Sequence, residues 1–243
     1  MTPSLRSLSH RIQQGWVGLA VIFVVTFISF WPSFFSAIVR VETHLIIHGI
    51  SAISWMLISV LQAWLINSKW RSYHRTIGYV SLVLAVVVVL SGLQVLQTML
   101  LKDQSVDGSH PLLAIKFFYV DIIALLLFSV FLWLAIRAAR THDIALHKRM
   151  IVCTAIIPLE AALERTFIYG TPGLVPNWNI ALYASTTTLI VLMALLIGLD
   201  RWKKRSRWPY TALLAYYVLM LLTTDWIADA AWFQAFAAFY ANL

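Results

Sequence analysis

The sequence predicts an all-α integral membrane protein, a seven-transmembrane-helix bundle with its N-terminus in the cytoplasm and its C-terminus outside. Three observations support this fold class. Hydrophobic residues make up 61% and charged residues 12% of the 243 positions, whereas soluble domains carry about 25% charged residues. The apolar residues gather in seven stretches, each close to the roughly 20 residues that cross a bilayer core of about 30 Å. The Lys and Arg residues lie in short runs between those stretches, where such runs orient membrane helices.

The predicted spans follow one another with only short polar connectors between them. The connectors are too short to fold independently, so residues 1–243 are expected to form a single transmembrane domain. The predicted spans cover approximately residues 14–38, 44–67, 74–101, 112–138, 147–169, 177–199 and 209–236.

The basic residues are divided unequally between the two sides of the predicted bundle. Fourteen of the 18 Lys and Arg residues fall on the side that holds the N-terminus. Cytoplasmic loops retain Lys and Arg, so this side is predicted to face the cytoplasm. The formal charge of +8 is thereby explained by orientation signals, and nucleic acid is not an expected partner.

Histidines are the first polar feature that needs an explanation, because polar groups at membrane depth are costly unless they are paired or bind something. His44 and His48 begin the second predicted span. Two imidazoles one helical turn apart can ligate one metal ion, and the alternative is that they only form hydrogen bonds to neighbouring helices. The same helical face continues with further polar or aromatic residues at spacings of three and four, namely Ser51, Trp55, Ser59 and Gln62.

A second pair of histidines lies at the cytoplasmic ends of the predicted helices. His74 is followed by Arg75, and His147 is followed two positions later by Arg149. Imidazole is a usual axial ligand of haem, and Arg matches carboxylates geometrically. The four residues are therefore predicted to bind haem b, with the arginines at its propionates. The alternative is that they anchor the inner helix ends.

Carboxylates within the predicted spans form the third polar feature. Glu160 and Glu164 are one turn apart on the fifth span, and together with His44 and His48 they are predicted to ligate a transition metal, copper or zinc. Two further interpretations remain open: a relay of protons between the acids and an ion-pair network that only fixes helix order. A buried polar network is predicted beside the metal, formed by Gln62, Asp121, Arg165, Asp225 and Asp229.

Several of these residues together resemble a family pattern over roughly residues 44–165. The pattern comprises His44-x3-His48-Gly49, Trp55, Gln62, His74-Arg75-x2-Gly78, His147-Lys148-Arg149-Met150 and Arg165. It resembles bacterial families of multi-pass membrane proteins of unknown function (DUF2306-like), although the tryptophan expected in the His147 motif is absent. The resemblance implies a multi-pass protein of the bacterial inner (plasma) membrane. It also implies that the residues of the pattern matter more for function than the histidines outside the pattern. It also favours haem or metal, because similar membrane families carry haem b or act in haem and copper oxidase assembly.

The predicted function is a membrane-embedded haem- or metal-binding protein of redox or electron-transfer type. The expected partners are the lipid bilayer and either quinone or other subunits of a membrane complex. One alternative is a noncatalytic accessory or assembly subunit of such a complex. Another is a proton-coupled transporter built on Asp121, Glu160, Glu164 and Asp229, and a further one is a zinc-dependent membrane hydrolase that uses His44 and His48. The sequence leaves open whether the protein is an enzyme.

Overall fold

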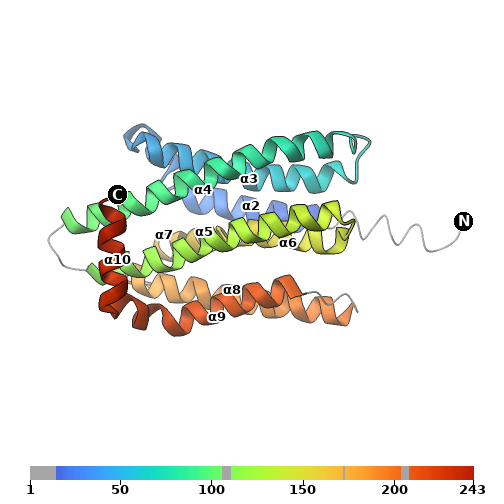
Figure 1. Cartoon of the computed structure of the whole chain (residues 1–243). Coiled ribbons are helices and arrows are strands. Elements are labelled where there is room, and N and C mark those ends of the chain that lie inside the picture. The colour runs from blue at the N-terminus through green and yellow to red at the C-terminus, as the bar shows by residue number, and fades with distance from the viewer. Residues whose placement is uncertain (1–14, 106–110, 172, 204–207) are drawn as a thin grey trace, which may run out of the picture. The chain divides into compact units, whose positions relative to one another are not determined.

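The computed structural model describes residues 15–105, 111–171, 173–203 and 208–243 (Figure 1). Every regular element within these ranges is a helix, which confirms the all-α prediction. The helices are α2 (Gly15–Phe30), the 3-10 helix η1 (Phe35–Arg40), α3 (Thr43–Leu65), α4 (Tyr73–Ser105), α5 (Pro111–Arg140), α6 (Ile144–Ile156), α7 (Leu159–Gly170), α8 (Trp178–Trp202), α9 (Trp208–Asp229) and α10 (Ala231–Ala241).

Five of the described helices are long and apolar enough to cross a membrane: α3, α4, α5, α8 and α9. A sixth helix, α2, is equally apolar but has 16 residues. Large apolar side chains on these helices point outward, as shown by Val83, Leu126 and Leu222, which are 68%, 61% and 73% exposed. Such surfaces are stable in hydrocarbon and unfavourable in water. The chain is therefore a membrane protein.

The chain forms two compact units, Met1–Ser91 and Gly92–Leu243. In the first unit α2 packs along α3. A side-chain contact joins α3 to α4, because His48 Nδ1 lies 3.1 Å from Ser91 Oγ. The first unit thus holds the histidines of the second predicted span.

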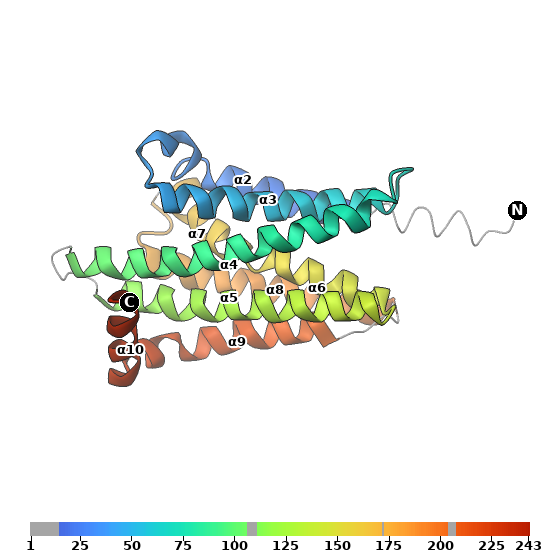
Figure 2. The ribbon, with the colours of Figure 1, turned by 45° about the horizontal axis from the view of Figure 1, so that its top comes forward.

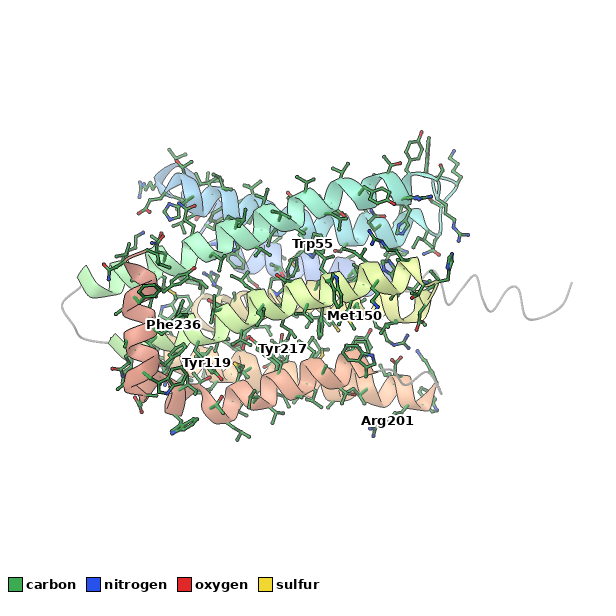
Figure 3. The ribbon with its side chains drawn as sticks, in the orientation of Figure 1. Trp55, Tyr119, Met150, Arg201, Tyr217 and Phe236 are labelled. Carbon is green, nitrogen blue, oxygen red and sulfur yellow. The ribbon has the colours of Figure 1, made fainter. Side chains whose placement is uncertain are left out.

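The second unit is a layered helix bundle (Figure 2), in which α5 packs against α6 and α9, and α8 packs between α7 and α9. Its centre contains Met150, Leu189, Met193, Leu213 and Tyr217, each at most 1% exposed. Figure 3 shows Tyr217 in the middle of the unit, between Phe236 at one end and Arg201 at the other. The two ends are named here after α8: Trp178 marks its N-terminal end and Arg201 lies at its C-terminal end.

The predicted fifth span, residues 147–169, is two helices in the structure. α6 ends at Ile156 and α7 begins at Leu159. Pro158 causes the break, because proline has no N–H with which to continue the α-helical hydrogen bonds. The N–H of Glu160 instead donates to Ile157 O, at 3.4 Å. The break thus lies two residues before the first of the two glutamates.

The predicted seventh span, residues 209–236, also ends earlier than expected. α9 stops at Asp229, and α10 turns across the end of the second unit (Figure 1). Aromatic packing stabilises this turn, because Phe118 of α5 stacks 5.7 Å from Phe233 and 5.0 Å from Tyr240. The Tyr240 hydroxyl donates to Leu93 O, at 2.8 Å, and burial raises the pKa of Tyr240, which keeps the phenol in its donating form.

Candidate functional site

The predicted metal ligands belong to different units of the chain. His44 and His48 lie on α3 in the first unit, and Glu160 and Glu164 lie on α7 in the second. His44 Nε2 lies 3.5 Å from Glu42 Oε2. Among the described residues, no group of three or more His, Cys, Asp or Glu side chains is placed to hold a metal ion. The copper or zinc site therefore stays a prediction.

His48 has a defined environment within the first unit. Its Nδ1 faces Ser91 Oγ, and that hydroxyl lies 2.6 Å from Val87 O. A serine hydroxyl has one hydrogen to donate, so a Ser91 that donates to Val87 accepts from His48. His48 then carries its proton on Nδ1 and keeps the Nε2 lone pair for an acceptor role.

The predicted haem residues are also divided, with His74 and Arg75 in the first unit and His147 and Arg149 in the second. His147 Nδ1 donates to Ala135 O, at 2.9 Å. The Arg149 guanidinium is held by Asp200 through two hydrogen bonds, of 2.7 Å from Nε and 3.0 Å from Nη2. Asp200 therefore occupies the geometry that the prediction gave to a haem propionate, and haem binding stays a prediction.

Gln62, which was predicted to join the carboxylate network, lies in the first unit beside Gly78 of α4. Both of its side-chain amide atoms are buried, and neither has a hydrogen-bond partner among the described residues. A Cβ atom at Gly78 would lie 3.6 Å from Gln62 Nε2. The structure thus brings together two members of the family-like pattern, Gln62 and Gly78, within α3 and α4.

The second unit holds a cluster of ionisable side chains, which is called the acid cluster below. It consists of the buried Glu160 and Glu164 and the half-buried Asp121 and Arg165. α7 supplies three of its members and α5 supplies Asp121. Glu160 and Glu164 are each 5% exposed, because the helical spacing of four turns both toward the neighbouring helices. Arg165 hydrogen-bonds to Ala161 O at 2.8 Å.

Electrostatic contacts link all members of the acid cluster. Asp121 interacts with Glu160, Glu164 and Arg165, and Glu164 interacts with Glu160 and Arg165. The cluster carries two more negative than positive charges when every member is ionised. Burial of unbalanced charge in a membrane bundle is costly, so the geometry favours a site that gains protons.

Hydroxyl groups from two further helices reach the acid cluster. Thr186 Oγ1 of α8 lies 2.7 Å from Glu160 Oε1. Tyr217 of α9 is fully buried and interacts electrostatically with Glu160. Tyr216 also interacts with Glu160, while its hydroxyl donates to Val120 O at 3.2 Å. These hydroxyls were not predicted from the sequence, although Thr186 follows Asn179 and Tyr183 at spacings of seven and three on one face of α8.

Asp225 and Asp229 were predicted within the buried network, and the structure corrects this placement. Both residues are exposed, and they lie on the outer face of the end of α9, whose inner face is buried through Thr224, Ile227 and Ala228. Asp225 forms an ion pair with Lys116, 2.6 Å from its Nζ. The same Nζ donates to Asn179 Oδ1, at 2.8 Å. This ion pair marks the N-terminal end of α8.

Comparisons of the chain with family models, with characterised proteins and with solved structures return no match. The family resemblance therefore stays an expectation from the sequence pattern. Any function has to be argued from the geometry of the two units.

Proposed function

We propose that this chain is a proton-coupled membrane carrier, and that the acid cluster is its proton-binding site. The observation that supports this function is the burial of two glutamates, Glu160 and Glu164, one turn apart on a helix that begins directly after a break. A single arginine, Arg165, offsets only part of their charge. Buried carboxyl groups that change charge at membrane depth are the elements from which proton relays are built.

The break between α6 and α7 supports the same function. Carriers bind their coupling ions near discontinuous helices, where interrupted backbone can move and can expose polar groups. α6 is pinned to α8 by the Arg149–Asp200 pair, whereas α7 begins after Pro158 and carries the ionisable side chains. α7 is therefore the element that we expect to move when the cluster gains or loses a proton.

The proposal includes a topology. We place α2, α3, α4, α5, the α6–α7 pair, α8 and α9 across the bilayer as seven spans, with the N-terminus in the cytoplasm of a bacterium and α10 in the outer interface. The basic residues at the C-terminal end of α8, Arg201 and Lys203, support this orientation. The aromatic residue Trp178 at the opposite end fits the outer aromatic belt.

A second candidate function is the redox function expected from the sequence. His48 and His147 each have Nδ1 next to an oxygen, Ser91 Oγ and Ala135 O respectively. A histidine that ligates a metal commonly donates its other ring N–H to such an oxygen. This arrangement supports haem or metal binding by either histidine, and with it electron exchange with quinone or a partner subunit.

The carrier function is tested by a pH jump on liposomes that contain the purified protein and are adsorbed to a solid-supported membrane. Proton binding and translocation move charge, so wild-type protein is expected to give a transient current in the absence of a known solute. The Glu160→Gln and Glu164→Gln variants are expected to give the signal of empty liposomes. Glu42→Gln is the matched control, because Glu42 is 49% exposed and lies outside the acid cluster. A wild-type current no larger than that of empty liposomes overturns the proposal.

A further inference from the structure

One face of α8 carries a polar stripe from the N-terminal end of the helix to the acid cluster. Asn179, Tyr183 and Thr186 follow one another at spacings of four and three, which places them on a single helical face. Asn179 contacts Lys116. The centroid of the Tyr183 ring lies 5.9 Å from Lys116 Nζ. Tyr183 interacts electrostatically with Asp225, while its hydroxyl has no hydrogen-bond partner within hydrogen-bonding geometry among the described residues. The stripe therefore begins at the exposed carboxylate of Asp225 and ends at Glu160.

The Thr186 hydroxyl lies within hydrogen-bonding distance of two oxygen atoms. Its Oγ1 lies 2.7 Å from Glu160 Oε1 and 2.8 Å from Leu182 O, and a hydroxyl has only one hydrogen to donate. Both contacts are satisfied together only when Glu160 carries a proton and donates it to Thr186, which then donates to Leu182. When Glu160 is ionised, the Thr186 hydrogen turns from Leu182 to the carboxylate. The orientation of this one hydroxyl thus follows the protonation of Glu160.

Tyr217 provides a second, independent observation, and it concerns the ionised state of Glu160. Its side chain is fully buried, its hydroxyl has no hydrogen-bond partner among the described residues, and its electrostatic interactions are with Glu160 and Cys153. A buried hydroxyl without an acceptor is unfavourable. The carboxylate of Glu160 is the acceptor that would remove this cost.

Toward the C-terminal end of α8, the helical face that carries Thr186 becomes apolar. Beyond Thr186, α8 presents Leu189 and Met193, which are fully buried together with Met150 of α6 and Leu213 of α9. Apolar side chains close-pack and offer no hydrogen-bonding groups to a proton. On α8 itself, the polar residues that lead to Glu160 therefore come from the side of Asp225.

We propose that protons reach Glu160 from the N-terminal end of α8, through Asp225, Tyr183 and Thr186, and that Thr186 performs the last transfer. In that transfer Thr186 Oγ1 accepts a proton from the direction of Tyr183 and gives its own hydrogen to Glu160 Oε1. One O–H bond forms and one breaks at the threonine, so the hydroxyl is regenerated and no electron is exchanged. This inference rests on the proposed function and adds the route and its direction.

The groups that face Glu160 come from every helix packed around it. They are Asp121 of α5, Glu164 and Arg165 of α7, Thr186 of α8, and Tyr216 and Tyr217 of α9, with Cys153 of α6 next to Tyr217. Among them, Thr186 is the member with a hydrogen bond to Glu160 and a place on the polar stripe. A substitution at Thr186 therefore tests the proton route and leaves the ionisable residues of the acid cluster in place.

The test measures the rate of the pH-jump current in Thr186→Val, an isosteric change that removes only the hydroxyl, and in Thr186→Ser, which restores it. We expect Thr186→Val to slow the current about a hundredfold, the lower end of what a positioned proton-transfer group contributes, and Thr186→Ser to recover it. Tyr183→Phe should slow the current as well, and the wild-type rate should fall in deuterium oxide. Thr187→Val is the matched control, because the Thr187 hydroxyl binds the carbonyl of residue i−4 as Thr186 does but is exposed on the other face.

The outcomes separate the route from the carrier function. A current that Glu160→Gln abolishes but that Thr186→Val and Tyr183→Phe leave at the wild-type rate overturns the route alone. A wild-type protein without any current overturns the carrier function and the route together. Equal slowing by Thr186→Val and Thr187→Val would trace the effect to helix packing, and it too would overturn the assignment of Thr186.

Discussion

The Arg149–Asp200 pair is expected to be a major contributor to the stability of the second unit. The two side chains are 13% and 18% exposed and share two hydrogen bonds, so either partner left alone is a largely buried, unpaired charge. Removal of one partner of such a pair costs about 3–5 kcal/mol, and the residual exposure places the value near 3. We predict this loss for Arg149→Leu and for Asp200→Leu, and a smaller loss for the double variant, in which no unpaired charge remains.

The assay is the free energy of unfolding in mixed micelles, measured for the wild type, both single variants and the double variant. The interaction energy from this cycle isolates the pair from the other contacts of each side chain. Arg137→Leu is the control, because Arg137 is an exposed basic residue near the same membrane face, and changes at such positions stay within about 0.5 kcal/mol. Single variants as stable as this control would refute the expectation and would leave Arg149 available to a haem propionate.

Three further predictions concern topology, the C-terminal helix and the redox function. In a Cys153→Ser background, a cysteine placed at Leu174 should react with a membrane-impermeant maleimide on intact cells, and one placed at Lys203 only after permeabilisation; the reverse pattern would invert the proposed orientation. Phe118→Ala should lower the free energy of unfolding by about 3–5 kcal/mol, because the ring is fully buried against α10, and a loss below 1 kcal/mol would show that α10 does not depend on it. If the redox function is correct, the purified protein should show a Soret band that shifts on reduction with dithionite, or about one bound zinc or copper by elemental analysis. The signal should be lost in His147→Ala or His48→Ala. A colourless, metal-free protein would contradict that function.

Residue composition was sufficient to predict the class of fold. Five predicted spans correspond to five long apolar helices, because a run of about 20 apolar residues forms a helix in lipid whatever its neighbours are. The breaks were harder to predict. The stop at Ile156 has a local cause in Pro158, a residue that membrane helices also tolerate within a continuous span. The stop at Asp229 has no Pro or Gly, and depends instead on contacts of α10 with Phe118, far away in the sequence.

The candidate site was predictable where its members are ionisable residues within the apolar spans. Glu160, Glu164 and Arg165 were recognised from their spacing, because an i, i+4 pair lies on one face of a helix. Asp121 was predicted with them as an ionisable residue inside an apolar span. The contribution of Thr186 and Tyr217 depends on which helices pack against α7, and periodicity within one helix carries no information on that. Asp225 and Asp229 were predicted within the network, but both lie on the exposed face of α9, opposite the buried Thr224, Ile227 and Ala228.

The acid cluster, the helix break and the Thr186 hydroxyl have a joint consequence for coupling. Arg149 and Asp200 hold α6 to α8 at one end, and Pro158 separates α6 from α7. The Glu160–Thr186 hydrogen bond is one of the contacts that join α7 to α8. When Glu160 is protonated, Thr186 also satisfies Leu182 within its own helix. When Glu160 is ionised, the Thr186 hydroxyl donates to its carboxylate instead of to Leu182 O. The net negative charge of the acid cluster then favours contact with water or a cation. If the proposed function is correct, we expect protonation of Glu160 to change how α7 packs on α8, which is the link between proton binding and helix packing that a coupled carrier requires.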